Sequence, residues 1–223
     1  MRKLLKKILD PILQKLFIAY YASSKTYTYK SISVNVHPEV FPPHFTISTK
    51  ILLDFLASKN LKNQTLLELG CGSGIISLYS ASKGAKVTAS DINQIALENL
   101  EESSKKNGLP IEILFSDLFQ NIPQTSFDCI IINPPYYPKA PKNTKEKAWY
   151  CGENFEYFEQ LFRQLGTEIS FKNTYMILSE DCHVLRIQKI ASKHALELTC
   201  ILKKQVCFEK NYIFKITKTP AIQ

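Results

Sequence analysis

The chain lacks the features that define several large classes of protein. None of its apolar runs reaches the roughly 18 residues that a helical membrane span requires. Its 6 cysteines include no C-x-x-C pair, and its 4 histidines show no metal-ligand spacing. Internal repeats and low-complexity segments are also missing. We therefore expect no bound metal, no disulfide scaffold and no stable membrane insertion.

The cysteines and the N-terminus both indicate a cytoplasmic protein. Cys129 and Cys200 lie in apolar, strand-like runs, which is typical of reduced and mostly buried thiols. The chain begins with Arg2 and Lys3, as a signal peptide does, but charged and polar residues soon interrupt any apolar core. The apolar positions from 4 to 16 recur at helical spacing instead, which predicts an amphipathic N-terminal helix.

From residue 64 onward, strand-like and helix-like segments alternate. Short apolar runs predict strands at 64–69, 86–90, 111–115, 127–132, 174–179, 196–203 and 212–217. Apolar positions three and four residues apart predict helices at 50–58, 75–83, 93–107, 153–169 and 183–193. Such alternation predicts an α/β fold with a doubly wound, mostly parallel, seven-stranded sheet. The last two strands have only a short link, so we expect an antiparallel last strand.

The segment before this pattern is predicted to be an extension of the main domain. Alternating residues at 25–36 favour a small hairpin. We therefore divide the chain into a helix-and-strand extension at residues 1–40 and a larger domain at residues 41–223. Ser48 or Thr49 is expected to cap the first helix of that domain.

A glycine-rich loop follows the first predicted strand of the large domain. It reads Glu68-Leu-Gly-Cys-Gly-Ser-Gly74, precedes a helix, and contains three of the chain's 7 glycines. Glycine lets the backbone approach a ligand closely and adopt a positive φ. The spacing is G-x-G-x-G, whereas the dinucleotide fingerprint that cradles a pyrophosphate is G-x-G-x-x-G. This difference disfavours an oxidoreductase that uses a dinucleotide.

Two more acids follow the next two predicted strands. Asp91 ends the second strand, where a carboxylate can accept both hydroxyls of a ribose. Asp117 follows the third strand, where a carboxylate can accept from an adenine amino group. Together with Glu68, these residues place acids at three successive strand ends. That pattern suits a cationic nucleoside without phosphates, and S-adenosylmethionine, with its sulfonium and ammonium groups, is such a molecule.

The fourth predicted strand ends in Asn133-Pro-Pro-Tyr136. Proline lacks an N–H and fixes its φ, so the strand must stop there. The side-chain amide of Asn133, the carbonyl of Pro134 and the ring of Tyr136 are left at the carboxyl edge of the sheet, where open α/β sheets bind ligands. These groups suit a flat acceptor that carries an NH₂ group, with two oxygens for its hydrogens and a ring to stack on it.

Taken together, these motifs resemble the class I S-adenosylmethionine-dependent methyltransferases. Within that class the chain is similar to the small-domain N-methyltransferases and to the HemK-type enzymes that methylate a glutamine of release factors. The resemblance implies a Rossmann-like methyltransferase fold, with S-adenosyl-L-methionine as the cofactor. It implies Asn133, Pro134 and Tyr136 as catalytic residues, and as cofactor-binding residues Thr49, Glu68, Gly70, Cys71, Gly72, Gly74, Asp91, Ile92, Asp117, Leu118 and Asn133.

The Asn-Pro-Pro-Tyr motif predicts methyl transfer to a planar nitrogen. Such a nitrogen is a poor nucleophile because its lone pair is delocalised. Asn133 and Pro134 are expected to accept one N–H each, which orients the nitrogen and favours a more pyramidal geometry. The methyl group then has to lie in line, ~3 Å away. A glutamine of a protein is the expected acceptor, and the HemK-type resemblance implies a release factor as the candidate protein. The alternative is adenine N6 or guanine N2 in RNA or DNA.

The chain is basic, with 28 lysines and arginines against 20 acids and a formal net charge of +8. This balance fits either a well-solvated surface or a polyanionic or acidic partner. Part of the excess follows Tyr136 closely, and we expect it to border the acceptor site. Its members are Lys139, Lys142, Lys145 and Lys147.

Overall fold

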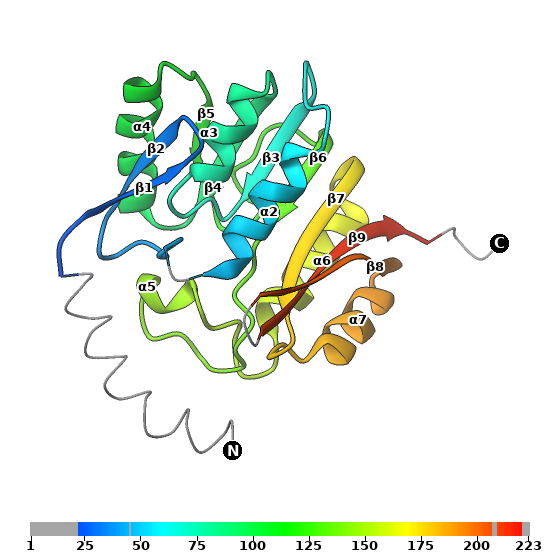
Figure 1. Ribbon diagram of the computed structural model, residues 1–223. Coiled ribbons are helices and arrows are strands. Elements are labelled where there is room, and N and C mark those ends of the chain that lie inside the picture. Colours follow the sequence, from blue (N-terminus) through cyan, green and yellow to red (C-terminus); the bar gives the residue numbers. More distant parts are fainter. Residues whose placement is uncertain (1–21, 45, 207–208, 220–223) are drawn as a thin grey trace.

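A computed structural model describes residues 22–44, 46–206 and 209–219. The helix expected at residues 4 to 16 lies outside the described residues, as does Cys207. The main feature of the described chain is a seven-stranded sheet with helices on both of its faces (Figure 1). This arrangement confirms the predicted α/β class.

The sheet has the strand order β5-β4-β3-β6-β7-β9-β8. Its strands are β3 (Thr65–Leu69), β4 (Lys86–Asp91), β5 (Glu112–Phe115), β6 (Ser126–Ile132), β7 (Ser170–Ser179), β8 (Leu196–Val206) and β9 (Glu209–Lys218). Neighbours from β5 to β7 are parallel, and β9 is antiparallel to both β7 and β8. The predicted antiparallel last strand is therefore confirmed. The order reverses direction between β3 and β6, which places a ligand-binding crevice at their carboxyl ends.

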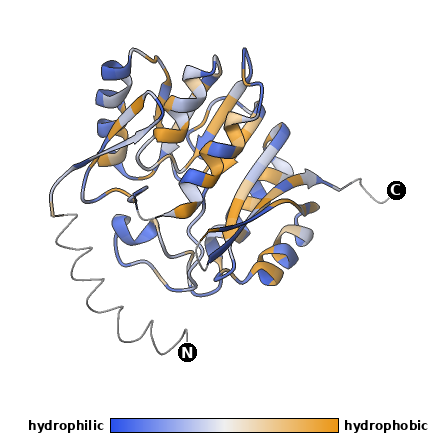
Figure 2. Ribbon diagram, viewed as in Figure 1, coloured by the Kyte–Doolittle hydropathy of each residue, from blue (hydrophilic) through white to orange (hydrophobic). Residues whose placement is uncertain are grey.

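Each face of the sheet has its own layer of helices and its own hydrophobic cluster. One cluster contains residues of α2 (Ile47–Ala57), α3 (Ile75–Ser82) and α4 (Gln94–Asn107), and the other contains residues of α6 (Glu156–Thr167) and α7 (Val184–Lys193). Strand residues alternate between the two, because successive side chains point to opposite faces. Ile131, for example, joins the first cluster and Ile132 the second. Figure 2 shows the resulting apolar stripes along the strands and the polar residues on the outer helical surfaces.

The predicted hairpin is confirmed and packs on the α4 side of the molecule. It consists of β1 (Lys25–Tyr29) and β2 (Ile32–Val36), paired antiparallel. Apolar residues of β2 belong to the first hydrophobic cluster. Asn107, at the end of α4, donates from Nδ2 to the Ser33 carbonyl at 2.8 Å. The hairpin therefore shares a core with the sheet, and the division of the chain at residue 40 stays a prediction.

Some predicted element boundaries were wrong for identifiable reasons. Helix α2 begins at Ile47 with Thr46 as the N-cap residue, so neither Ser48 nor Thr49 caps it, and Thr49 is buried within the helix. Strands β7 and β9 extend beyond their apolar centres, because polar residues continue the ladder with neighbouring strands. Helix α6 starts later than predicted, since Phe155 adopts a φ of 67° just before it.

The expectation of buried thiols holds for four of the described cysteines but not for Cys200. Cys71, Cys129, Cys151 and Cys182 are buried and free, whereas Cys200 is exposed. Cys200 lies on β8, at the edge of the sheet, where the ladder to β9 shifts register between Cys200 and Leu202. An apolar run therefore does not guarantee burial on an edge strand.

Gly74 provides a test of how the glycine loop is joined to the core. It precedes α3 with a φ of 71°, and a Cβ there would lie 2.2 Å from Cδ1 of the buried Leu100 on α4. Gly108 has a similar φ of 64° but nothing within 4 Å of its Cβ position. Gly108→Ala should cost about 1 kcal/mol of backbone strain. Gly74→Ala should cost roughly 1–3 kcal/mol more, because it also overpacks the core.

Urea unfolding of the two variants beside the wild type measures this difference. Equal losses of unfolding free energy in Gly74→Ala and Gly108→Ala would show that Leu100 moves aside without cost.

Candidate functional site

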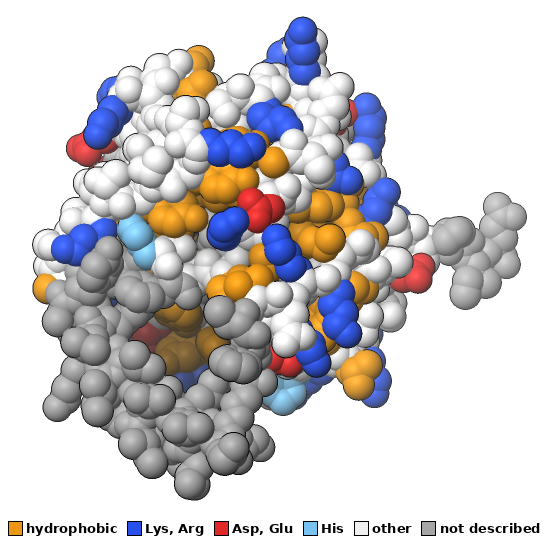
Figure 3. All heavy atoms as spheres, viewed as in Figure 1, with side chains coloured by type: hydrophobic (Ala, Val, Ile, Leu, Met, Phe, Trp, Pro, Cys, Tyr) orange, Lys and Arg blue, Asp and Glu red, His pale blue; other side chains and the backbone are white. Residues whose placement is uncertain are grey.

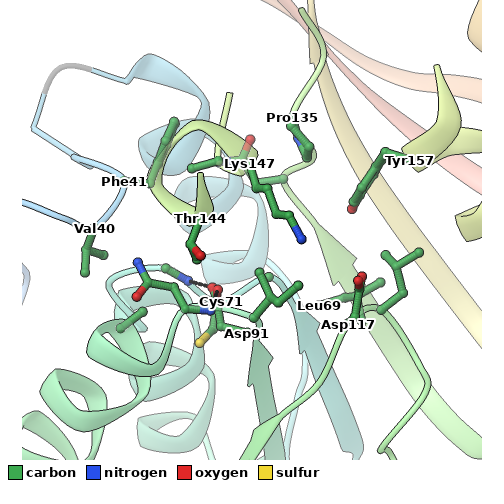
Figure 4. Close-up of a pocket in the computed structure, with 18 of the residues that line it drawn as sticks. Val40, Phe41, Leu69, Cys71, Asp91, Asp117, Pro135, Thr144, Lys147 and Tyr157 are labelled. Atoms are coloured by element: carbon green, nitrogen blue, oxygen red, sulfur yellow. Dashed lines mark hydrogen bonds between the residues drawn. The ribbon is translucent and has the colours of Figure 1, made fainter. Parts of the chain in front are cut away.

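The cavity that brings the predicted motifs together lies at the carboxyl ends of the central strands. It has a volume of about 280 Å³ (Figure 4). The predicted site residues that line it are Thr49, Glu68, Gly70, Cys71, Gly72, Asp91, Ile92, Asp117, Leu118 and Asn133. Gly74, Pro134 and Tyr136 are not among its lining residues. Parallel strands end at the same edge of a sheet, and for this reason motifs far apart in sequence meet here.

Asp91 joins the glycine loop to the end of β4. Its Oδ2 accepts from the backbone N–H of Gly72 at 2.8 Å, and its Oδ1 accepts from that of Asn93 at 2.9 Å. Burial raises the pKa of Asp91, and the backbone N–H donors oppose that shift. A carboxylate has about four lone-pair directions, so each oxygen can still accept from a ligand. Asp91 can therefore fix the loop and bind hydroxyl groups at the same time.

Glu68 lies deeper and holds the start of α3. Its Oε2 accepts from the backbone N–H of Ser77 at 2.7 Å and from the Ser77 hydroxyl. Burial raises the pKa of Glu68 to about 8, while the Ser77 hydrogen bonds lower it and the nearby charge of Asp91 raises it further. Glu68 therefore titrates near neutral pH, and its ionised form is stabilised by any cation in the cavity.

Tyr157, on helix α6, faces Asp117, the acid that follows β5. Figure 4 shows the hydroxyl of Tyr157 and the carboxylate of Asp117 directed into the same part of the cavity. Burial raises the pKa of Tyr157, and the charges of Asp91 and Asp117 raise it further. The phenol stays protonated at neutral pH and can serve as a hydrogen-bond donor.

The Asn-Pro-Pro-Tyr segment contributes to the cavity in part. Asn133 and Pro135 line it, and Pro134 is buried beneath. The ring of Tyr136 packs against the second hydrophobic cluster and lies 4.7 Å from the ring of Tyr137, between centroids. Burial raises the pKa of the Tyr136 phenol. The ring of Tyr136 is therefore packed among other side chains. Its stacking on an acceptor stays a prediction.

After this segment the chain forms a loop, residues 137–152, that returns over the cavity as a roof. The loop closes on itself, since Tyr137 N–H donates to the Trp149 carbonyl at 3.1 Å and Cys151 N–H donates to the Tyr137 carbonyl at 3.0 Å. It carries the short helix α5 (Thr144–Lys147). Its lining residues are Pro141, Thr144, Lys147, Ala148, Tyr150, Cys151 and Gly152.

Two contacts attach the roof to the segment before α2. Lys145 Nζ lies 3.0 Å from Glu39 Oε1, and the rings of Trp149 and Phe41 lie 4.8 Å apart. Phe41 also lies over the glycine loop, because a Cβ on Gly72 would be 3.7 Å from Phe41 Cβ. The cavity is thus enclosed from above by two segments about a hundred residues apart in sequence.

Sequence reasoning missed several lining residues. They are Val40 and Phe41 before α2, Glu156, Tyr157 and Gln160 on α6, and the lining residues of the roof loop other than Lys147. Lys147 was expected at the acceptor site with Lys139, Lys142 and Lys145, and it alone of the four lines the cavity. A signal for the α6 set existed: Glu156 and Gln160 are four residues apart, so they share one side of the helix near its first turn. With Glu156 counted, four carboxylic acids and one lysine line the cavity, and Glu68 is the acid that keeps its proton below a pKa of about 8. This balance favours a cationic ligand.

The parts of the chain that the structure describes contain neither a candidate metal site nor a candidate membrane span. There, no three His, Cys, Asp or Glu side chains form a group that could hold a metal ion. In the same residues, no helix combines the length and hydropathy needed to cross a bilayer.

The family model described as "Methyltransferase small domain" matches residues 31–149, more than half of the chain. A putative protein N5-glutamine methyltransferase of Methanocaldococcus jannaschii is 40% identical over 112 residues, which cover 50% of this chain and 54% of that protein. The chain thus spans about half the length of this curated relative. A tRNA1(Val) (adenine(37)-N6)-methyltransferase of Aliivibrio salmonicida is 26% identical over 195 residues, covering 84% of this chain and 81% of that protein.

Among solved structures, the 16S rRNA N2 G1207 methyltransferase of T. thermophilus, in complex with AdoMet and guanosine, is similar with a TM-score of 0.63. The alignment has 14% identity and covers 88% of this chain and 50% of that chain. At this identity the likeness concerns the fold alone. It confirms the predicted Rossmann-like methyltransferase fold.

The raised pKa of Glu68 makes stability depend on pH in a testable way. Between its ordinary pKa near 4.5 and its folded pKa of about 8, the folded chain keeps a proton that the unfolded chain releases. The free energy of unfolding should therefore fall as pH rises through this window, by at most about 1.4 kcal/mol per pH unit for one proton. Glu68→Gln keeps an oxygen that can accept from Ser77 but does not titrate, so its profile should be flatter.

Urea unfolding of wild type and Glu68→Gln at several pH values from 5 to 9 gives the free energy of unfolding of each protein. Subtracting one pH profile from the other removes the contribution of the other titrating groups. Parallel profiles across this range would contradict the raised pKa.

Proposed function

Since the chain belongs to the methyltransferase small domain family, we propose that it transfers a methyl group from S-adenosylmethionine, the donor of this family, to a planar nitrogen. The observation that carries the proposal is the common cavity of Asn133 and the three strand-end acids. In such a cavity a cationic nucleoside and a nitrogen acceptor can meet. The HemK-type assignment made from the sequence is part of the same proposal.

The cofactor roles follow from the residues that line the cavity. When bound, S-adenosylmethionine supplies an electrophilic methyl group on a positively charged sulfur. We assign the ribose hydroxyls to Asp91 and the adenine amino group to Asp117. The backbone at Gly70 and Gly72 leaves room for a ligand, because no side chain projects there. The carboxylates offset the positive charge of the cofactor within a partly enclosed site.

The acceptor nitrogen is assigned to Asn133. This residue directly follows β6, which pairs with β3, the strand before the glycine loop, so its amide lies beside the cofactor position. The Asn133 side-chain oxygen accepts one N–H of the acceptor, and the Pro134 carbonyl is proposed for the second. These hydrogen bonds hold the nitrogen lone pair in line with the methyl group, which is catalysis by positioning.

A protein glutamine is the first candidate acceptor, supported by the name of the 40% identical archaeal relative. An adenine or guanine amine of RNA is the second. It is favoured by the tRNA methyltransferase relative, which matches most of the chain, and by the basic surface. Figure 3 shows lysines and arginines outnumbering acids on the face that carries α2, β7 and β9. Methyl-labelled cofactor incubated with cell extract separates the two, because the label is released by protease in one case and by ribonuclease in the other.

Asn133→Ala tests the reaction itself. The variant should bind S-adenosylmethionine as the wild type does and lose roughly 100-fold or more in turnover, the scale for removing one preorganised polar group at a reacting centre. Calorimetry measures the affinity, and transfer of labelled methyl to the extract measures the turnover. Asn60→Ala, in the exposed link between α2 and β3, is the matched control and should be fully active.

An Asn133→Ala protein with wild-type turnover would contradict the proposed mechanism. Loss of cofactor affinity in the same variant would instead show that Asn133 binds the cofactor.

A further inference from the structure

One lysine stands among the acids of the cavity. Of the described lining residues, four are carboxylic acids and Lys147 is the only lysine or arginine. It ends α5, in the roof loop, and its side chain is exposed to water. None of the roles assigned under the proposed function uses this residue.

The direction of Lys147 differs from that of its neighbours in the roof loop. Figure 4 shows its side chain reaching down from α5, with the ammonium directed toward Asp117 and the hydroxyl of Tyr157. Lys145 instead pairs with Glu39, and Lys139 lies over the ring of Tyr150, 4.4 Å from its centroid. Among these roof lysines, Lys147 alone lines the cavity.

Two roles are available to an ammonium in this position. It can bind the carboxylate of the cofactor's methionine part, or it can act as an internal counter-ion of the cavity acids that competes with the cofactor's positive charges. A lysine that binds the carboxylate of the cofactor would not be expected to point toward acidic side chains, whereas a lysine that acts as their counter-ion would. The orientation of Lys147 toward Asp117 therefore favours the second role.

We propose that Lys147 is a specificity-determining residue: it supplies a positive charge inside the cavity and thereby lowers the affinity for S-adenosylmethionine relative to that for S-adenosylhomocysteine. This inference rests on the proposed function. The two ligands share the ribose, adenine, ammonium and carboxylate groups, and they differ in the methyl group and in the charge of the sulfur. A fixed positive charge in the same cavity disfavours the charged sulfur and leaves the neutral one nearly unaffected.

The size of the cavity makes this interaction effective. In a cavity of about 280 Å³ that the roof partly encloses, water and salt screen the charges less than they do at an open surface. The exposure of Lys147 to water weakens the interaction, as for other solvated charges. We therefore expect its removal to change the ratio of the two dissociation constants by about two- to fivefold.

The roof does not depend on Lys147 for its position. The Lys145–Glu39 ion pair, the Phe41–Trp149 ring contact and the backbone hydrogen bonds of the loop all remain when its charge is removed. Lys147→Met keeps an unbranched side chain of similar length, and Lys147→Gln is a second neutral variant. A change in ligand preference can therefore be read as an effect of charge, once unchanged thermal unfolding has been checked.

Calorimetry of S-adenosylmethionine and S-adenosylhomocysteine with both neutral variants tests the proposal. Affinity for S-adenosylmethionine should rise about two- to fivefold relative to that for S-adenosylhomocysteine. Lys147→Arg should keep the wild-type ratio. Lys142→Met, in the same loop but outside the cavity lining, is the matched control and should also keep it.

If the neutral variants bind both ligands more weakly by the same factor, the proposal is overturned, and Lys147 is assigned to the carboxylate that the two ligands share. An unchanged ratio in Lys147→Met and Lys147→Gln would overturn it as well. Failure of the wild type to bind S-adenosylmethionine would instead refute the proposed function, so the two failures are distinguishable.

Discussion

The hydrogen bond from the backbone N–H of Gly72 to Asp91, at 2.8 Å, is the contact on which the site depends. It fixes the glycine loop against the end of β4, while the other oxygen of Asp91 holds the turn into α4 at Asn93. A half-buried carboxylate is costly to ionise, and the raised pKa of Asp91 reflects that cost. Two N–H donors offset part of it. A cationic ligand would offset more, so the strand-end acids and the proposed cofactor stabilise each other.

The proline pair after β6 creates the other half of the site. Because neither proline can continue the ladder, the chain leaves the sheet at Asn133 and has to return over the carboxyl edge. The return path is the roof loop, held by its own backbone hydrogen bonds and by contacts with Glu39 and Phe41. One local feature of the sequence therefore both exposes the Asn133 amide and covers the cavity beside it.

Much of the sheet and of its acidic edge could be predicted from the sequence, because both depend on local patterns. The alternation of strand-like and helix-like segments predicted a parallel sheet. In such a sheet Glu68, Asp91 and Asp117, each at or just after the end of a strand, lie at the same edge. The sequence pattern placed Lys147 near the acceptor site with three other lysines but could not single it out, and it did not indicate Tyr157. Both positions depend on how α6 and the roof loop pack against residues far away in sequence. The exposure of Cys200 and the polar ends of β7 were missed for a related reason. The residues of one strand do not indicate whether a neighbouring strand pairs with its ends, or whether the strand lies at the edge of the sheet with its side chains exposed.

The acidic cavity is proposed to accept a cationic nucleoside. The most direct measurement is calorimetric titration of the wild-type chain with S-adenosylmethionine and, separately, with NAD⁺. Both contain adenosine, but NAD⁺ carries a pyrophosphate that the ionised carboxylates of the lining repel. We expect saturable binding of S-adenosylmethionine and no measurable binding of NAD⁺ at the same concentration. Comparable affinity for the two, or binding of NAD⁺ alone, would contradict it.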